Sequence, residues 1–157
     1  MDLKQIPDLT GKNVAIIGWP SSGKTFLSKE LAELYPDHKI FHTDDYMNLG
    51  YRQSMYQCME DVLCADGSTI VEGVQCYRML RKGVEKSSYY PDVIIEIKID
   101  EFHLEKVYSD ERSNVDIDHV YKMIRNNRKV FEDYLKMDNY RKPLHVVVEN
   151  NFLKNES

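Results

Sequence analysis

Short apolar runs alternate with amphipathic stretches along most of the chain. Runs of β-branched and aliphatic residues, each ended by glycine or polar residues, predict strands at 13–17, 39–42, 69–73, 93–99 and 144–148. Such continuous runs suit strands that are buried on both faces of a parallel sheet. The chain therefore reads as a set of core strands separated by other elements.

Helices are predicted between these strands from apolar residues three or four positions apart. Leu27, Leu31 and Leu34 share one face of a helix over 25–35, and a second amphipathic helix covers about 51–64. A long stretch from residue 117 keeps one apolar stripe and must end before Pro143. Strands alternating with helices predict an α/β fold, doubly wound, with a mostly parallel five-stranded sheet between two helix layers.

The domain organisation predicted is a single unit covering residues 1–157, because no repeat, linker or low-complexity tract divides the chain. Its core is expected over about 13–149, followed by a short polar tail over 150–157. In sheets of this kind, ligands bind beyond the carboxyl ends of the strands. Candidate functional residues are therefore sought just after each strand.

Composition and charge exclude several classes of function. A formal net charge of -5 argues against an extended nucleic-acid partner, which binds mainly to clustered cations. The three cysteines lack paired spacing and are expected to be small buried hydrophobes in a reducing compartment. The histidines are scattered and do not predict a metal site built from them. The sequence has no apolar run long enough to span a membrane, so no membrane partner and a cytoplasmic protein are expected.

The segment from Gly18 to Thr25 fits the phosphate-binding pattern GxxxxGK(S/T) and lies between a predicted strand and a predicted helix. Backbone N–H groups of such a loop cradle phosphates, and Lys24 is expected to reach the β- and γ-phosphates of a nucleoside triphosphate. The Thr25 hydroxyl is expected to ligate Mg²⁺. Trp19 is expected to pack on a neighbour. The predicted nucleotide-binding residues are Gly18, Ser21, Ser22, Gly23, Lys24, Thr25 and Phe26.

Two carboxylates follow the second predicted strand in the segment Asp44-Asp45-Tyr46. The base-binding NKxD motif of switch GTPases is absent, and the only DxxG precedes the phosphate loop. Parallel strands place Asp44 and Asp45 beside the loop, where a kinase needs a base. The pattern therefore favours phosphoryl transfer.

A phosphate loop joined to an Asp-Asp-aromatic segment resembles the P-loop kinases of small metabolites and nucleosides, with the uridine kinase group the nearest. The resemblance implies an ATP phosphotransferase in which Asp44 is the catalytic base and Asp45 the alternate. Glu72-Gly73 is similar to the Glu-Gly of that group, whose acid organises Mg²⁺ or substrate. The metal ligands implied are Thr25, Asp44 and Glu72, and the substrate contacts implied are Asp45, Tyr46, Glu72 and Arg78.

The stretch from residue 99 to Arg112 is similar to the lid entry of nucleotide kinases. By this resemblance Arg112 is the first lid and catalytic candidate, with Arg125 and Arg128 as further phosphate contacts. Arg78 or Arg81, shortly after Glu72-Gly73, could also meet an anionic acceptor.

Three functional readings remain open from the sequence. The first is a kinase of a small acceptor, with a nucleoside or nucleotide favoured. The second is a polynucleotide 5′-kinase, whose loop and Asp-Asp-Tyr segment are also similar. The third is a nucleotide-binding regulatory module without catalysis. The preference between ATP and GTP and the oligomeric state, a homodimer included, stay open.

Overall fold

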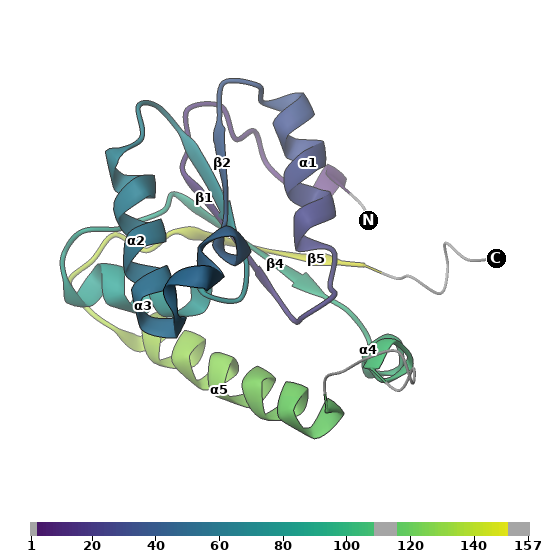
Figure 1. Ribbon diagram of the computed structural model, residues 1–157. Coiled ribbons are helices and arrows are strands. Elements are labelled where there is room, and N and C mark those ends of the chain that lie inside the picture. Colours follow the sequence, from purple (N-terminus) through teal and green to yellow (C-terminus); the bar gives the residue numbers. More distant parts are fainter. Residues whose placement is uncertain (1–2, 109–115, 151–157) are drawn as a thin grey trace.

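Five parallel strands form one sheet in the computed structural model, which describes residues 3–108 and 116–150 (Figure 1). The spatial order is β2-β3-β1-β4-β5, and every pairing in it is parallel. The mostly parallel five-stranded sheet predicted from the sequence is confirmed, and in the described residues it has no antiparallel strand. The strands are β1 Val14–Gly18, β2 Lys39–His42, β3 Thr69–Glu72, β4 Val93–Lys98 and β5 Leu144–Glu149.

Helices connect the strands and cover both faces of the sheet. In Figure 1, α1 lies on one face, while α2, α3 and α5 lie on the other. The 51–64 helix predicted from the sequence matches the bounds of α2, whereas α3 and α4 were not predicted as helices. The helices are η1 Leu3–Gln5, α1 Lys24–Leu34, η2 Thr43–Leu49, α2 Tyr51–Cys64, α3 Cys76–Glu85, α4 Glu101–Tyr108 and α5 Ile117–Lys136.

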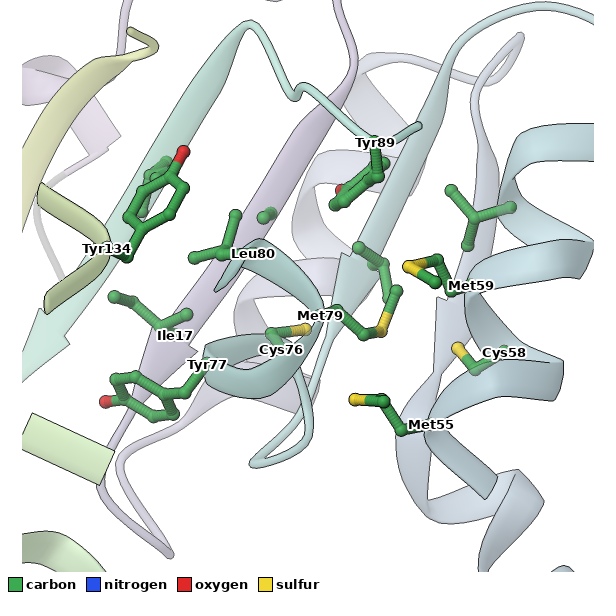
Figure 2. Close-up of a cluster of buried hydrophobic side chains, with 14 of the residues drawn as sticks. Ile17, Met55, Cys58, Met59, Cys76, Tyr77, Met79, Leu80, Tyr89 and Tyr134 are labelled. Atoms are coloured by element: carbon green, nitrogen blue, oxygen red, sulfur yellow. The ribbon is translucent and has the colours of Figure 1, made fainter. Parts of the chain in front are cut away.

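The central strand β1 is buried along its whole length, as a strand between two helix layers must be. Val14 and Ile16 belong to the cluster on the α1 face, and Ala15 and Ile17 belong to the cluster on the opposite face. Figure 2 shows this second cluster, in which methionine and cysteine side chains of α2 and α3 point toward one another. Strand alternation thus divides the core into two layers.

The core also includes residues before position 13, which was the predicted start of the core. Leu9 is fully buried in the cluster on the α1 face, and Leu3 and Ile6 pack against that cluster. The N-terminal segment therefore adds to the helix layer formed by α1.

The phosphate loop, the Thr43–Asp45 segment and Gly73 follow β1, β2 and β3, so they lie together at the carboxyl edge of the sheet. Among the described residues, no helix is long and apolar enough to cross a membrane.

Candidate functional site

The phosphate loop joins β1 to α1, and its backbone has no place for a side chain at two positions. A Cβ on Gly18 would lie 2.6 Å from Ser22 Oγ and 3.0 Å from the Ile97 carbonyl oxygen. Gly23 has φ +97°, a conformation that residues with a Cβ rarely adopt. Both glycines of the motif are therefore needed for the shape of the loop.

Lys24 is directed into its own loop. Its Nζ donates hydrogen bonds to the Trp19 carbonyl at 2.7 Å and to the Gly18 carbonyl at 3.1 Å. Burial lowers the pKa of the Lys24 ammonium, and the Glu72 carboxylate partly opposes this shift. The ammonium is thus held where anionic phosphate oxygens would be better partners than neutral carbonyls.

Asn150 fixes the loop from the far end of the chain. Its side-chain amide donates to the Ser22 carbonyl at 3.1 Å, and its backbone N–H donates to the Lys98 carbonyl at 2.9 Å. The residue is buried, although the sequence had assigned it to the polar tail. The residue that directly follows β5 therefore supports the phosphate loop.

Glu72 connects the carboxyl ends of β2 and β3 to the loop. It is 3% exposed, and its Oε1 lies 2.7 Å from His42 Nδ1. The same oxygen accepts a hydrogen bond from Thr25 Oγ1 at 3.2 Å. The predicted metal ligands Thr25 and Glu72 are therefore in direct contact.

A cavity of about 500 Å³ lies over the loop and is lined by most of the residues predicted to bind the nucleotide. An adjoining hollow of about 250 Å³ is lined by Thr25, His42, Asp44, Asp45 and Glu72. Asp44 and Asp45 are both exposed at this edge. The larger cavity is lined by Pro20, Ser21, Ser22, Gly23, Lys24, Thr25, Phe26, Asp44, Glu72, Gly73, Val74 and Tyr108.

The charges and oxygen atoms of this cavity suit a metal ion. Its described lining carries the cation Lys24 and the two carboxylates Asp44 and Glu72. A bound Mg²⁺ would offset the repulsion between a triphosphate and these two carboxylates. The described residues hold no group of three or more His, Cys, Asp or Glu side chains suited to a metal. Mg²⁺ needs fewer, because it uses one or two carboxylates together with substrate phosphates and water. Oxygen donors from Thr25, Asp44 and Glu72 fit that requirement.

Two of the residues predicted to contact the substrate, Tyr46 and Arg78, have partners within the protein. The Tyr46 hydroxyl donates to Asp61 Oδ2 at 2.7 Å, and burial raises the pKa of this phenol. Arg78 lies over the Tyr51 ring, 4.2 Å from its centroid, and donates to Gln75 Oε1 at 3.1 Å. Neither Tyr46 nor Arg78 lines the phosphate cavity or the adjoining hollow. Arg81 pairs with Glu85 at 3.6 Å on α3.

The lid candidates are not brought together over the phosphate loop in the described residues. Arg112 lies outside the described residues. Arg125 is exposed and lines neither of the two spaces at the loop. Arg128 lines a separate cavity of about 420 Å³, together with Trp19, Glu96 and His145. Trp19 also packs against a cluster formed by α4 and α5, as expected from the sequence.

Tyr108 at the end of α4 reaches the phosphate loop, a contact that the sequence did not predict. Its hydroxyl lies 3.3 Å from Ser21 Oγ, and its side chain lines the phosphate cavity. The one feature of the sequence that could have suggested this contact is that Tyr108 is an aromatic residue near the end of the predicted lid entry. The α4 helix thus approaches the loop through tyrosine in the described part of the chain.

Solved structures of kinases share this architecture. A gluconokinase from Sinorhizobium meliloti superposes with a TM-score of 0.56 at 13% identity, covering 90% of this chain and 84% of that one. For shikimate kinase from Acinetobacter baumannii the TM-score is 0.55 at 13% identity, over 91% and 86% of the two chains. For thymidylate kinase from Candida albicans it is 0.52 at 11% identity, over 92% and 86%. No protein-family model and no curated protein matches the sequence.

These similarities concern the fold, because the identities are low. The chain has the three-layer α/β fold that these kinase structures share. This agrees with the broad class suggested by the phosphate loop and the Asp-Asp-Tyr segment. The finer resemblance to the uridine kinase group stays a prediction.

Proposed function

We propose that the chain is an ATP- and Mg²⁺-dependent phosphotransferase that moves the γ-phosphate to a hydroxyl or phosphate of a small acceptor, with a nucleoside or nucleotide favoured. The observation that carries this proposal is one cavity lined by Lys24, Thr25, Asp44 and Glu72. A phosphate-binding cation, oxygen ligands for a metal and a candidate base thus share one space.

Phosphoryl transfer depends mainly on positioning and on neutralising charge, and the residues of the cavity suit those tasks. The loop backbone and Lys24 would hold the β- and γ-phosphates. Thr25, Glu72 and Asp44 would hold Mg²⁺, which when bound neutralises charge on the triphosphate. Asp44 would also accept the proton of the attacking hydroxyl, with Asp45 in the adjoining hollow as the alternate base.

The neighbouring structures support the acceptor being small. Gluconokinase, shikimate kinase and thymidylate kinase are all named as kinases of small molecules, and each is covered over more than four fifths of its length. Among the described residues that line the site, no cluster of cations would follow a nucleic-acid backbone. A small acceptor therefore remains favoured over an oligonucleotide end.

The test is transfer of labelled γ-phosphate from ATP to a panel of nucleosides, nucleotides, sugars and 5′-hydroxyl oligonucleotides. Lys24→Ala and Asp44→Asn should each reduce transfer by about 100-fold or more, as expected for loss of charge stabilisation or of a base. Lys29→Ala and Asp37→Asn change exposed residues of the same type outside the cavity and should leave transfer unchanged.

Three results would contradict the proposal. Full turnover in both Lys24→Ala and Asp44→Asn would remove these residues from the reaction. Transfer confined to oligonucleotide ends would identify a polynucleotide 5′-kinase. Tight ATP binding without transfer to any acceptor would identify a regulatory module.

A further inference from the structure

We propose that His42 is a positioning residue that sets the Mg²⁺ affinity of the nucleotide site by orienting the Glu72 carboxylate. This inference rests on the proposed function, because it concerns the same cavity. In the sequence, His42 stands out only as one of five scattered histidines. Its role arises from the contacts that the fold creates.

The strand register places the two side chains side by side. His42 is the last residue of β2 and Glu72 the last of β3, and the two residues are partners in the parallel pairing. The His42 side chain is 29% exposed, whereas that of Glu72 is 5% exposed. An ionised carboxylate can only accept hydrogen bonds, so the imidazole donates its Nδ1–H to Glu72 Oε1 across 2.7 Å.

The same carboxylate oxygen determines where the Thr25 hydroxyl points. Thr25 Oγ1 donates its only proton to Glu72 Oε1 at 3.2 Å. A hydroxyl that has donated its proton keeps its lone pairs for a metal ion. The rotamer of Glu72 therefore sets the orientation of Thr25, and the bond from His42 restricts that rotamer.

Among the described residues, the other charged groups near Glu72 make no hydrogen bond to its carboxylate. The Lys24 ammonium interacts electrostatically with Glu72, but its Nζ donates to two loop carbonyls. Asp44 and Asp45 line the adjoining hollow and carry the same charge as Glu72. Of the two hydrogen bonds described for Glu72, the one from His42 thus holds the carboxylate to the neighbouring strand. The one from Thr25 orients the Thr25 hydroxyl.

Partners that orient a metal ligand typically change metal affinity by about 10–100-fold when they are removed. His42→Ala should therefore raise the Mg²⁺ concentration at half-saturation by about 10–100-fold. Binding of the nucleotide without metal depends on the loop backbone and Lys24, so it should change by less than about threefold. If His42 only held β2 to β3, its removal would weaken Mg²⁺ binding and metal-free nucleotide binding together.

The experiment uses the fluorescence of Trp19, the single tryptophan, which belongs to the phosphate loop. A non-hydrolysable ATP analogue is titrated in EDTA, and Mg²⁺ is then titrated at a saturating concentration of the analogue. Two matched variants accompany His42→Ala. His42→Asn keeps an N–H donor at the same number of bonds from Cα as Nδ1, whereas His42→Gln moves the donor one bond further.

The Mg²⁺ midpoint of His42→Asn should lie within about threefold of the wild-type midpoint. The midpoints of His42→Ala and His42→Gln should both be raised. The proposal is overturned if His42→Ala keeps the wild-type midpoint, if His42→Asn fails to restore it, or if analogue binding in EDTA falls in parallel. Because the titrations involve no acceptor, they remain informative if phosphoryl transfer is not found. An unchanged midpoint in an enzyme that does transfer phosphate would refute only the role of His42.

Discussion

Gly73, directly after β3, is predicted to tolerate no side chain. Its φ of +135° lies in a region that other residues rarely adopt. A Cβ built there would lie 1.8 Å from Thr43 Oγ1 and 2.9 Å from Thr43 Cβ. Thr43 is 1% exposed and cannot turn its side chain into solvent. Gly73→Ala should therefore destabilise the protein through both backbone strain and overlap.

The two costs can be separated by a matched glycine. Forcing a residue with a Cβ into a sparsely populated backbone region costs about 1–3 kcal/mol, and overpacking adds about 1–3 kcal/mol. Gly73→Ala should thus lower the free energy of unfolding by about 2–6 kcal/mol. Gly67 has φ +86° with no atom within 4 Å of a built Cβ, so Gly67→Ala should show the backbone cost alone.

Urea unfolding followed by circular dichroism would measure these free energies. Thr43→Ala in the Gly73→Ala background removes the closest atom and should recover about 1–2 kcal/mol of the overlap cost. Equal losses for Gly73→Ala and Gly67→Ala would refute the steric reasoning. A double variant no more stable than Gly73→Ala would show that Thr43 is not the obstacle.

Two further predictions concern the last strand and its neighbours. Asn150→Ala removes the amide that holds the Ser22 carbonyl and should cost about 1–3 kcal/mol of stability and weaken binding of the ATP analogue. Unchanged affinity in a Trp19 fluorescence titration would contradict this support. The hydrogen bond from His145 lowers the pKa of Glu96, so the pair stabilises the fold above the ordinary pKa of glutamate and loses this effect as pH falls through the lowered value. The stability difference between wild type and Glu96→Gln should therefore shrink from pH 7 to pH 3 in urea unfolding, and a constant difference would argue against the bond.

Local sequence signals were sufficient where an element depends on neighbouring residues. The phosphate loop, the strand before it and the helix after it were predicted together, because glycine spacing and apolar runs encode them directly. The predicted bounds of α2 also agree with the structure, since its apolar stripe ends at a clear turn. The order of elements then predicted the parallel sheet.

The missed helix α3 shows the limit of such signals. Cys76, Tyr77 and Leu80 form a buried stripe at helical spacing, but Gly83 near the end reads as a helix breaker. The glycine has a packing reason instead, because a Cβ there would lie 2.5 Å from the Tyr89 carbonyl oxygen. That contact depends on how the following turn folds back, which a helical pattern does not encode.

For the candidate site, the sequence could predict which residues lie at the ends of the strands but not which side chains contact each other. Asp44 and Glu72 could be placed near the loop because parallel strands share one carboxyl edge. The bond from His42 to Glu72 required knowing that β2 pairs with β3, and a single sequence does not specify strand order. The contact of Arg78 with Tyr51 could not be predicted for a similar reason, since Tyr51 belongs to another helix.

The bond between Asn150 and Ser22 joins positions 128 residues apart, and it has a consequence for the order of folding. Contacts of such long sequence separation form late, because the entropy of closing the intervening chain is lost before they contribute. During synthesis, the phosphate loop leaves the ribosome long before the residue that supports it. Nucleotide binding by a nascent chain should therefore strengthen only after β5 has joined the sheet, so a bound nucleotide would favour the completed fold over its precursors.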